Sequence, residues 1–141
     1  MTKTILTADD EPWFSAGMKE IIEEEGYHVV SVEDGTAAID YLESGQPCDL
    51  VILDIMMPTG ARLIDPAYGR RTGIKVGEYI RQNLKSHVPI IYLTVVADQS
   101  VHNRIIEIET LATDMPRIIT KPVIPSELLN VINDCVGSPD A

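Results

Sequence analysis

Aromatic residues and cysteines are both scarce in this chain of 141 residues. Aromatic residues make up 5% of the sequence, and there are only two cysteines, Cys48 and Cys135. The cysteines lie far apart and form no Cys-x-x-Cys motif, so we expect reduced, buried thiols of a cytoplasmic protein. A disulfide between them is the alternative interpretation.

Positive charge is scarce as well. The chain has 11 Lys and Arg against 22 Asp and Glu, which gives a formal net charge of -11. A surface this acidic repels the phosphate backbone, so we expect no direct contact with nucleic acid. No apolar run reaches membrane-spanning length and no signal peptide opens the chain, so we expect no membrane contact.

Several familiar site motifs are also missing. The sequence contains no P-loop, no Gly-x-Gly-x-x-Gly and no Gly-x-Ser-x-Gly, and the histidines His28, His87 and His102 show no metal-ligand spacing. What the chain does have is 45% hydrophobic residues, which is typical of a globular protein. Its length predicts a single domain over residues 1–141.

The most informative segment is a short apolar run that ends on an acid, Leu50 to Asp54, with Pro58 soon after it. A run this short and rich in Val and Ile predicts a strand buried on both faces of a parallel sheet. Asp54 would then lie at the carboxyl end of a central strand, where open α/β sheets place their ligand sites. From position alone, the acid could be a metal ligand, a base, a nucleophile or a loop cap.

Strand and helix patterns alternate five times along the chain. The predicted strands are Lys3–Ala8, Tyr27–Val32, Asp49–Asp54, Pro89–Thr94 and Arg117–Thr120. The predicted helices begin at about Pro12, Thr36, Gly73, Asp98 and Pro125, the third ending near Leu84 and the last near Cys135. This alternation predicts an α/β fold with three layers and a doubly wound five-stranded parallel sheet.

Polar residues follow four of the five predicted strands: Asp9 and Asp10, Asp54, Thr94 and Lys121. In a sheet of order 2-1-3-4-5 these four strand ends are neighbours, so the acids would share one pocket. Two carboxylates at about 4 Å repel by about 4 kcal/mol at a surface-like dielectric, so the pocket needs a proton or a cation. Oxygen ligands alone suit Mg²⁺ or Mn²⁺, and Lys121 and Thr94 suit phosphoryl oxygens.

Together these residues resemble the receiver domain of response regulators, the phosphoacceptor module of two-component signalling. The matching motifs are Asp9-Asp10, Leu53-Asp54-x-x-Met57-Pro58, Leu93-Thr94 and Lys121-Pro122. The resemblance covers about Thr4 to Cys135 and implies a flavodoxin-like fold with the strand order 2-1-3-4-5. Several motifs in register make the match specific.

The resemblance implies a metal-dependent phosphoacceptor site. Asp54 would accept a phosphoryl group from a phosphohistidine of a sensor histidine kinase or a phosphotransfer protein. Asp10 and Asp54 would bind Mg²⁺ (or Mn²⁺) directly, Asp9 would bind it through a water, and Met56 would bind it through the backbone carbonyl.

The resemblance also assigns the two remaining site residues. Lys121 would contact the phosphoryl oxygens, and Thr94 would move toward the phosphate and so report it. The domain would not be an enzyme in its own right, although it would assist its own phosphorylation and dephosphorylation. The expected outputs are binding of an unidentified downstream protein and a homodimer.

The chain departs from the family pattern at four places. Residues 59–72 form an insertion that contains three arginines, which we expect to contact a partner or to fold over the pocket. The alternative is a solvated insertion without a role. Val95 follows Thr94 where the family has a small residue, and Asp114-Met115-Pro116 replaces a Gly-Ala pair. Ile118 stands in place of the usual aromatic switch residue, so we expect the output to pass through the loop after Thr94 and the following helix.

Two alternatives to a working switch remain. One is a pseudo-receiver, which has the same fold and acts only as a protein-binding module. The other is an aspartate-based phosphohydrolase, which is disfavoured because Met56 stands where a second acid would be needed. No output domain follows the last predicted helix, so the chain either acts through a partner or belongs to a longer protein.

Overall fold

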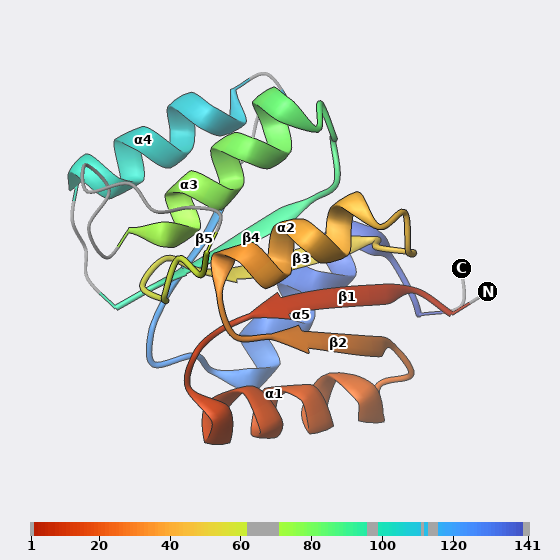
Figure 1. Ribbon diagram of the computed structural model, residues 1–141. Coiled ribbons are helices and arrows are strands. Elements are labelled where there is room, and N and C mark those ends of the chain that lie inside the picture. Colours follow the sequence, from red (N-terminus) through yellow and green to blue (C-terminus); the bar gives the residue numbers. More distant parts are fainter. Residues whose placement is uncertain (1, 62–70, 96–98, 111, 113–115, 140–141) are drawn as a thin grey trace.

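A five-stranded parallel sheet in the order β2-β1-β3-β4-β5 forms the centre of the computed structural model, which describes residues 2–61, 71–95, 99–110, 112 and 116–139 (Figure 1). The strands are β1 Thr4–Ala8, β2 His28–Val32, β3 Leu50–Asp54, β4 Ile90–Thr94 and β5 Arg117–Thr120. The helices are α1 Pro12–Glu24, α2 Gly35–Glu43, α3 Thr72–Glu78, the π-helical η1 Tyr79–Asn83, α4 Gln99–Glu109 and α5 Pro125–Val136. The predicted fold class and strand order are confirmed.

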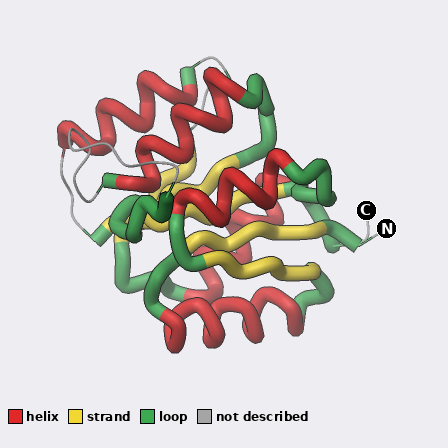
Figure 2. The backbone as a smooth tube through the Cα atoms, in the orientation of Figure 1, coloured by secondary structure: helices red, strands yellow, loops and turns green. Residues whose placement is uncertain are grey.

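Helices cover both faces of the sheet and create two separate cores (Figure 2). Helices α2, α3 and α4 pack on one face, while α1 and α5 pack on the other. Along β3, Val51 and Leu53 point into the first core, whereas Leu50 and Ile52 point into the second. Because both faces of β3 are covered, its sequence is apolar throughout instead of alternating.

The helix predicted from Gly73 to Leu84 has the expected extent, but its last part is wider than an α-helix. The Leu84 N–H donates to the Tyr79 carbonyl at 3.0 Å, which is the π-helical pattern of η1. At the other end, α3 starts one residue early, at Thr72. A Cβ on Gly73 would lie 2.5 Å from the Asp54 carbonyl oxygen, so only glycine allows α3 to begin this close to β3.

The inserted loop is attached to the rest of the fold at both ends. Where it begins, the Thr36 N–H of α2 donates to the Thr59 carbonyl at 2.9 Å. Gly60 follows with a φ of +75°, and a Cβ there would lie 2.5 Å from the Thr36 hydroxyl. Where the loop ends, the Gly73 N–H donates to the Ile55 carbonyl at 2.9 Å.

Some expectations fall on parts of the chain outside the described residues. These are the contacts of residues 62–70 in the insertion, the helix cap expected from Asp98, and residues 113–115. The described part of the chain contains no helix that is both long and apolar enough to cross a membrane.

The two cysteines are free thiols, which agrees with the expected reduced state. They pack against different cores, Cys48 on the α2 side of the sheet and Cys135 on the α5 side, so the alternative of a disulfide between them is wrong. The expectation that both are buried is also wrong, because each is partly exposed at the edge of its core. Burial nevertheless raises the pKa of Cys48 to about 11, which keeps this thiol protonated.

Candidate functional site

Asp54 is the last residue of β3 and is buried, with 2% of its surface exposed. The strand pairing continues past it, because the Ile55 N–H donates to the Leu93 carbonyl of β4 at 3.0 Å. One carboxylate oxygen of Asp54, Oδ1, accepts the Met56 N–H at 3.1 Å. The other oxygen, Oδ2, remains directed at the cation described below.

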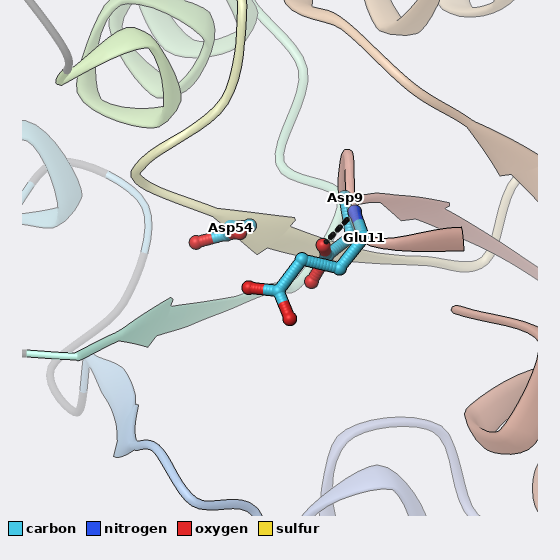
Figure 3. A group of neighbouring side chains, drawn as sticks. All are labelled: Asp9, Glu11 and Asp54. Carbon is cyan, nitrogen blue, oxygen red and sulfur yellow. Dashed lines mark hydrogen bonds between the residues drawn. The ribbon is translucent and has the colours of Figure 1, made fainter. Parts of the chain in front are cut away.

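Asp9 follows β1 directly and is also buried, with 4% exposed. Its Oδ1 accepts the Glu11 N–H at 2.9 Å, so the chain folds back and brings the Glu11 side chain toward Asp54 (Figure 3). Asp9, Glu11 and Asp54 each contribute a carboxylate oxygen to a group whose members lie within 4.8 Å of one another. Asp9 and Asp54 therefore share one space at the carboxyl edge of the sheet, as the strand order predicts, whereas Glu11 takes the place expected for Asp10.

Lys121 brings the cation into this space from the end of β5. Its Nζ lies 3.1 Å from Asp9 Oδ2, 3.2 Å from Asp54 Oδ2 and 3.7 Å from Glu11 Oε1. Its backbone N–H donates to the Thr94 carbonyl at 2.7 Å, which fixes the start of the chain after β5 against β4. We call Asp9, Glu11, Asp54 and Lys121 the acid pocket.

An aromatic ring also lies against the Lys121 ammonium. The ammonium lies 4.6 Å from the centre of the Phe14 ring of α1, and only 10% of the Lys121 side chain is exposed. A cation held over an aromatic ring in a desolvated place is attracted by the ring's π electrons. The ring and the acids thus restrict the positions open to the ammonium.

The charges in the acid pocket shift the proton affinities of its members. Burial, followed by the charge of Asp9, raises the pKa of Asp54 to about 6, although Lys121 acts in the opposite direction. Burial alone would lower the pKa of Lys121, but the charges of Asp54 and Asp9 outweigh burial and raise it. Lys121 is therefore protonated at neutral pH, and Asp54 is largely ionised.

The remaining predicted site residues lie around this pocket. Thr94 ends β4 next to Asp54 and is buried, with 3% exposed. Asp10 is exposed and lies outside the group of three close carboxylates. Together with Met56, it lines a neighbouring hollow of about 470 Å³.

Glu11 is the member of the pocket that the sequence did not predict. It reads as the residue that opens the helix at Pro12, and the chemical roles were assigned to Asp9 and Asp10. The signal available was the third consecutive acid in Asp9-Asp10-Glu11. No side-chain cap hydrogen bond joins Glu11 to α1 within the described structure, so its carboxylate is available to the pocket.

The pocket suits a hard divalent metal. It contains three carboxylates and one ammonium. The possible metal ligands in this group are therefore all carboxylate oxygens. Oxygen-only sites with excess negative charge favour Mg²⁺ or Mn²⁺. The raised pKa of Asp54 supports this interpretation, because its anion is not fully compensated by the protein alone.

Comparison with known families agrees with this geometry. The family model of the response regulator receiver domain matches residues 5–133. The chain belongs to this family. It is therefore a receiver domain of two-component signalling, with the flavodoxin-like fold expected from the resemblance.

Among curated relatives, the receiver domain is similar to the alkaline phosphatase synthesis transcriptional regulatory protein PhoP of Bacillus subtilis (strain 168). The two are 32% identical over 128 residues, which is 91% of this chain and 46% of PhoP. The phosphate regulon transcriptional regulatory protein PhoB of Escherichia coli (strain K12) is 29% identical over 130 residues, 92% of this chain and 49% of PhoB. The chain thus spans less than half the length of these relatives.

Solved structures show the same fold. A CheY-like receiver domain protein from Methanospirillum hungatei JF-1 superposes with a TM-score of 0.77 at 24% identity, covering 95% of this chain and 93% of that one. The receiver domain of a sensor histidine kinase from Pseudomonas aeruginosa PAO1 gives a TM-score of 0.71 at 27% identity, covering 98% of this chain and all of that one. That structure has a magnesium ion coordinated in its active site cleft.

Proposed function

We propose that this receiver domain is a phosphoacceptor switch in which Asp54 takes a phosphoryl group from a phosphohistidine of a sensor histidine kinase or a phosphotransfer protein. The observation that carries the proposal is the position of Lys121 Nζ, within 3.2 Å of the Oδ2 atoms of both Asp54 and Asp9. A buried nucleophile, a buried second acid and a fixed cation are the groups that phosphoryl transfer needs.

In this reaction a carboxylate oxygen of Asp54 attacks the phosphorus. The bond from phosphorus to the imidazole nitrogen breaks, and its electron pair leaves with the imidazole. Lys121 is protonated and already lies beside the attacking carboxylate, so its N–H groups can bind the incoming phosphoryl oxygens. Thr94, buried at the neighbouring strand end, would bind the phosphate after transfer and report it.

We assign the metal to Mg²⁺ or Mn²⁺, bound directly by Asp10, Asp54 and the Met56 carbonyl, with Asp9 acting through a water. The hollow that Asp10 and Met56 both line supports these two residues as ligands. The magnesium ion in the active site cleft of the Pseudomonas aeruginosa receiver domain supports the choice of metal. When bound, the metal would neutralise the charge of the phosphoryl group.

The proposed output is a change in protein binding. Ile118 on β5 is partly buried against the core and has no polar end to expose, so the change would pass through the segment after Thr94 and α4. Val95 and Ile106 support a contact surface there, because 48% and 46% of their respective surfaces are exposed. Its occupant would be a downstream protein or a second copy of this chain in a phosphorylation-dependent homodimer.

The remaining assignments follow from this function. We propose that residues 1–141 form one receiver domain with an inserted loop at 59–72, and that this loop contacts a partner or folds over the acid pocket. The domain is not an enzyme, although it assists its own phosphorylation and dephosphorylation. The free thiols of Cys48 and Cys135 support a cytoplasmic location.

The test is labelling with acetyl phosphate in the presence of Mg²⁺. The native chain should gain one phosphoryl group, detected by intact mass, while Asp54→Asn and the native chain in EDTA should gain none. Asp40→Asn is the matched control, since Asp40 is an exposed acid of α2, and it should label like the native chain. A native chain that gains no phosphate would instead favour the pseudo-receiver, and labelling of Asp54→Asn at the native rate would contradict the assignment of Asp54.

A further inference from the structure

Glu11 stands at the entrance of the acid pocket, with 47% of its side chain exposed, whereas Asp9 and Asp54 are buried. We propose that Glu11 selects the phosphoryl donor: its negative charge slows transfer from small donors with two negative charges more than transfer from donors with one. This inference rests on the proposed function, since it takes Asp54 as the acceptor. It assigns to Glu11 a specificity role in that reaction.

The backbone holds the Glu11 carboxylate in the pocket. The Glu11 N–H is bonded to Asp9 Oδ1, and the next residue, Pro12, begins α1. Glu11 takes the helix N-cap position, but its side chain makes no cap hydrogen bond within the described structure. Its carboxylate instead extends toward Asp54, as Figure 3 shows, and its Oε1 lies 3.7 Å from Lys121 Nζ.

This position affects a donor in two ways. The incoming phosphoryl oxygens have to approach the Lys121 ammonium, and Glu11 already shares that ammonium with Asp9 and Asp54. The Glu11 carboxylate also repels the donor's own negative charge. Both effects increase with donor charge, so two donors that deliver the same phosphoryl group should respond differently to Glu11.

Acetyl phosphate and phosphoramidate provide this comparison. With acetyl phosphate, an Asp54 oxygen bonds to phosphorus while the bond from phosphorus to oxygen breaks, and acetate leaves with the electron pair. With phosphoramidate, the bond from phosphorus to the protonated nitrogen breaks, and ammonia leaves with the pair. At neutral pH acetyl phosphate is a dianion, whereas phosphoramidate, with its protonated nitrogen, is mainly a monoanion.

Coulomb's law gives the size of the effect. At a separation of about 5 Å in water at moderate salt, one carboxylate slows a dianion by about fivefold to tenfold. It slows a monoanion by about twofold to threefold under the same conditions. The ratio of the two rates should therefore change by about threefold when the charge of Glu11 is removed.

The experiment measures initial phosphorylation rates of the full chain by intact mass, with each donor, at saturating Mg²⁺ and at low and high salt. Glu11→Gln removes the charge and keeps the shape. Glu11→Asp keeps the charge. Glu20→Gln is the matched control, because it removes an exposed acid of the same helix away from the pocket.

We expect Glu11→Gln to speed acetyl phosphate transfer about threefold more than phosphoramidate transfer, and this difference to shrink at high salt. Glu11→Asp and Glu20→Gln should keep the native ratio. If Glu11→Gln raises the phosphorylation rate equally for both donors, or does not raise it, the proposed role of Glu11 is wrong, but Asp54 remains the acceptor. If the native chain takes phosphate from neither donor, this inference and the proposed function both fail.

Discussion

Within the described part of the chain, two clusters of charged side chains that are mostly buried differ in their balance of charge. In the first, which we call the arginine cluster (Arg81, Glu109 and Tyr92), Arg81 Nε and Nη2 donate to the two Glu109 oxygens at 2.8 and 2.7 Å. The Tyr92 hydroxyl donates to Glu109 at 3.2 Å. One cation thus meets one anion, whereas the acid pocket holds three carboxylates around one ammonium.

This difference in charge balance indicates a structural role for the arginine cluster and a functional role for the acid pocket. The arginine cluster joins η1, α4 and β4, and the protein itself satisfies its charges, so it needs no ligand. The acid pocket lies at the carboxyl edge of the sheet and carries excess negative charge, which a divalent cation would balance. Burial of charged side chains alone therefore does not indicate a functional site. Burial of charges that the protein itself does not neutralise does indicate one.

The largest expected effect concerns the arginine cluster. Arg81→Met leaves Glu109, which is 1% exposed, as an uncompensated buried anion, and should lower the free energy of unfolding by about 3–5 kcal/mol. Urea unfolding at pH 7 measures this change. The double variant Arg81→Met/Glu109→Leu removes both charges and should recover most of the loss. A single variant as stable as the native chain would show that the cluster is not the balanced structural pair described.

A smaller effect of opposite sign is expected in the acid pocket. The folded-state pKa of Asp54 is raised to about 6 from an ordinary value of 3.8, so the folded chain binds this proton more tightly than the unfolded chain. The resulting stabilisation is complete below about pH 4 and is lost as the pH rises through about 6. Asp54→Asn is neutral throughout, and should be more stable than the native chain by about 3 kcal/mol at pH 7.5 in EDTA.

Thermal unfolding from pH 4 to 8 tests this sign. The advantage of Asp54→Asn should appear only as the pH rises, and Mg²⁺ should reduce it by stabilising the native chain more than the variant. An Asn variant that is less stable than the native chain at pH 7.5 without metal would mean that the pocket is balanced after all. The comparison between the two clusters would then break down.

The smallest effect is expected for Tyr92→Phe. The change removes one hydrogen bond to Glu109 and leaves both bonds from Arg81, so it should cost about 1 kcal/mol in urea unfolding. Tyr92 precedes Thr94 by two residues and lies on the same face of β4. If the variant also changes the rate of Asp54 phosphorylation, the arginine cluster is coupled to the pocket and is not purely structural.

Which of these features the sequence predicts depends on how local their signals are. The apolar run of β3 ending at Asp54 is a local pattern, and the strand order then brings Lys121 to it from the far end of the chain. The pair Arg81 and Glu109 is not predicted from the sequence, because neither residue follows a strand end and Arg81 lies in the unpredicted π-helical turn η1.

Glu11 escaped prediction for a different reason. An acid just before Pro12 reads equally well as the opening of a helix, and only the hydrogen bond from its own N–H to Asp9 turns its side chain toward the pocket. The direction of the Glu11 side chain depends on local geometry, which the periodicity of the sequence does not predict. The periodicity of apolar residues predicts helices and strands. The direction of a single polar side chain depends on the residues that contact it in the folded chain.

Gly60, near the start of the insertion, and Gly73, directly after it, enclose a segment whose length can change. Gly60 is locked against Thr36 and Gly73 against the end of β3, so both attachment points are fixed by the core. Doubling a loop between fixed ends costs only about 0.6 kcal/mol in closure entropy. A peptide tag or a fluorescent label could therefore be spliced between these glycines while β3 and the residues around Asp54 keep their positions.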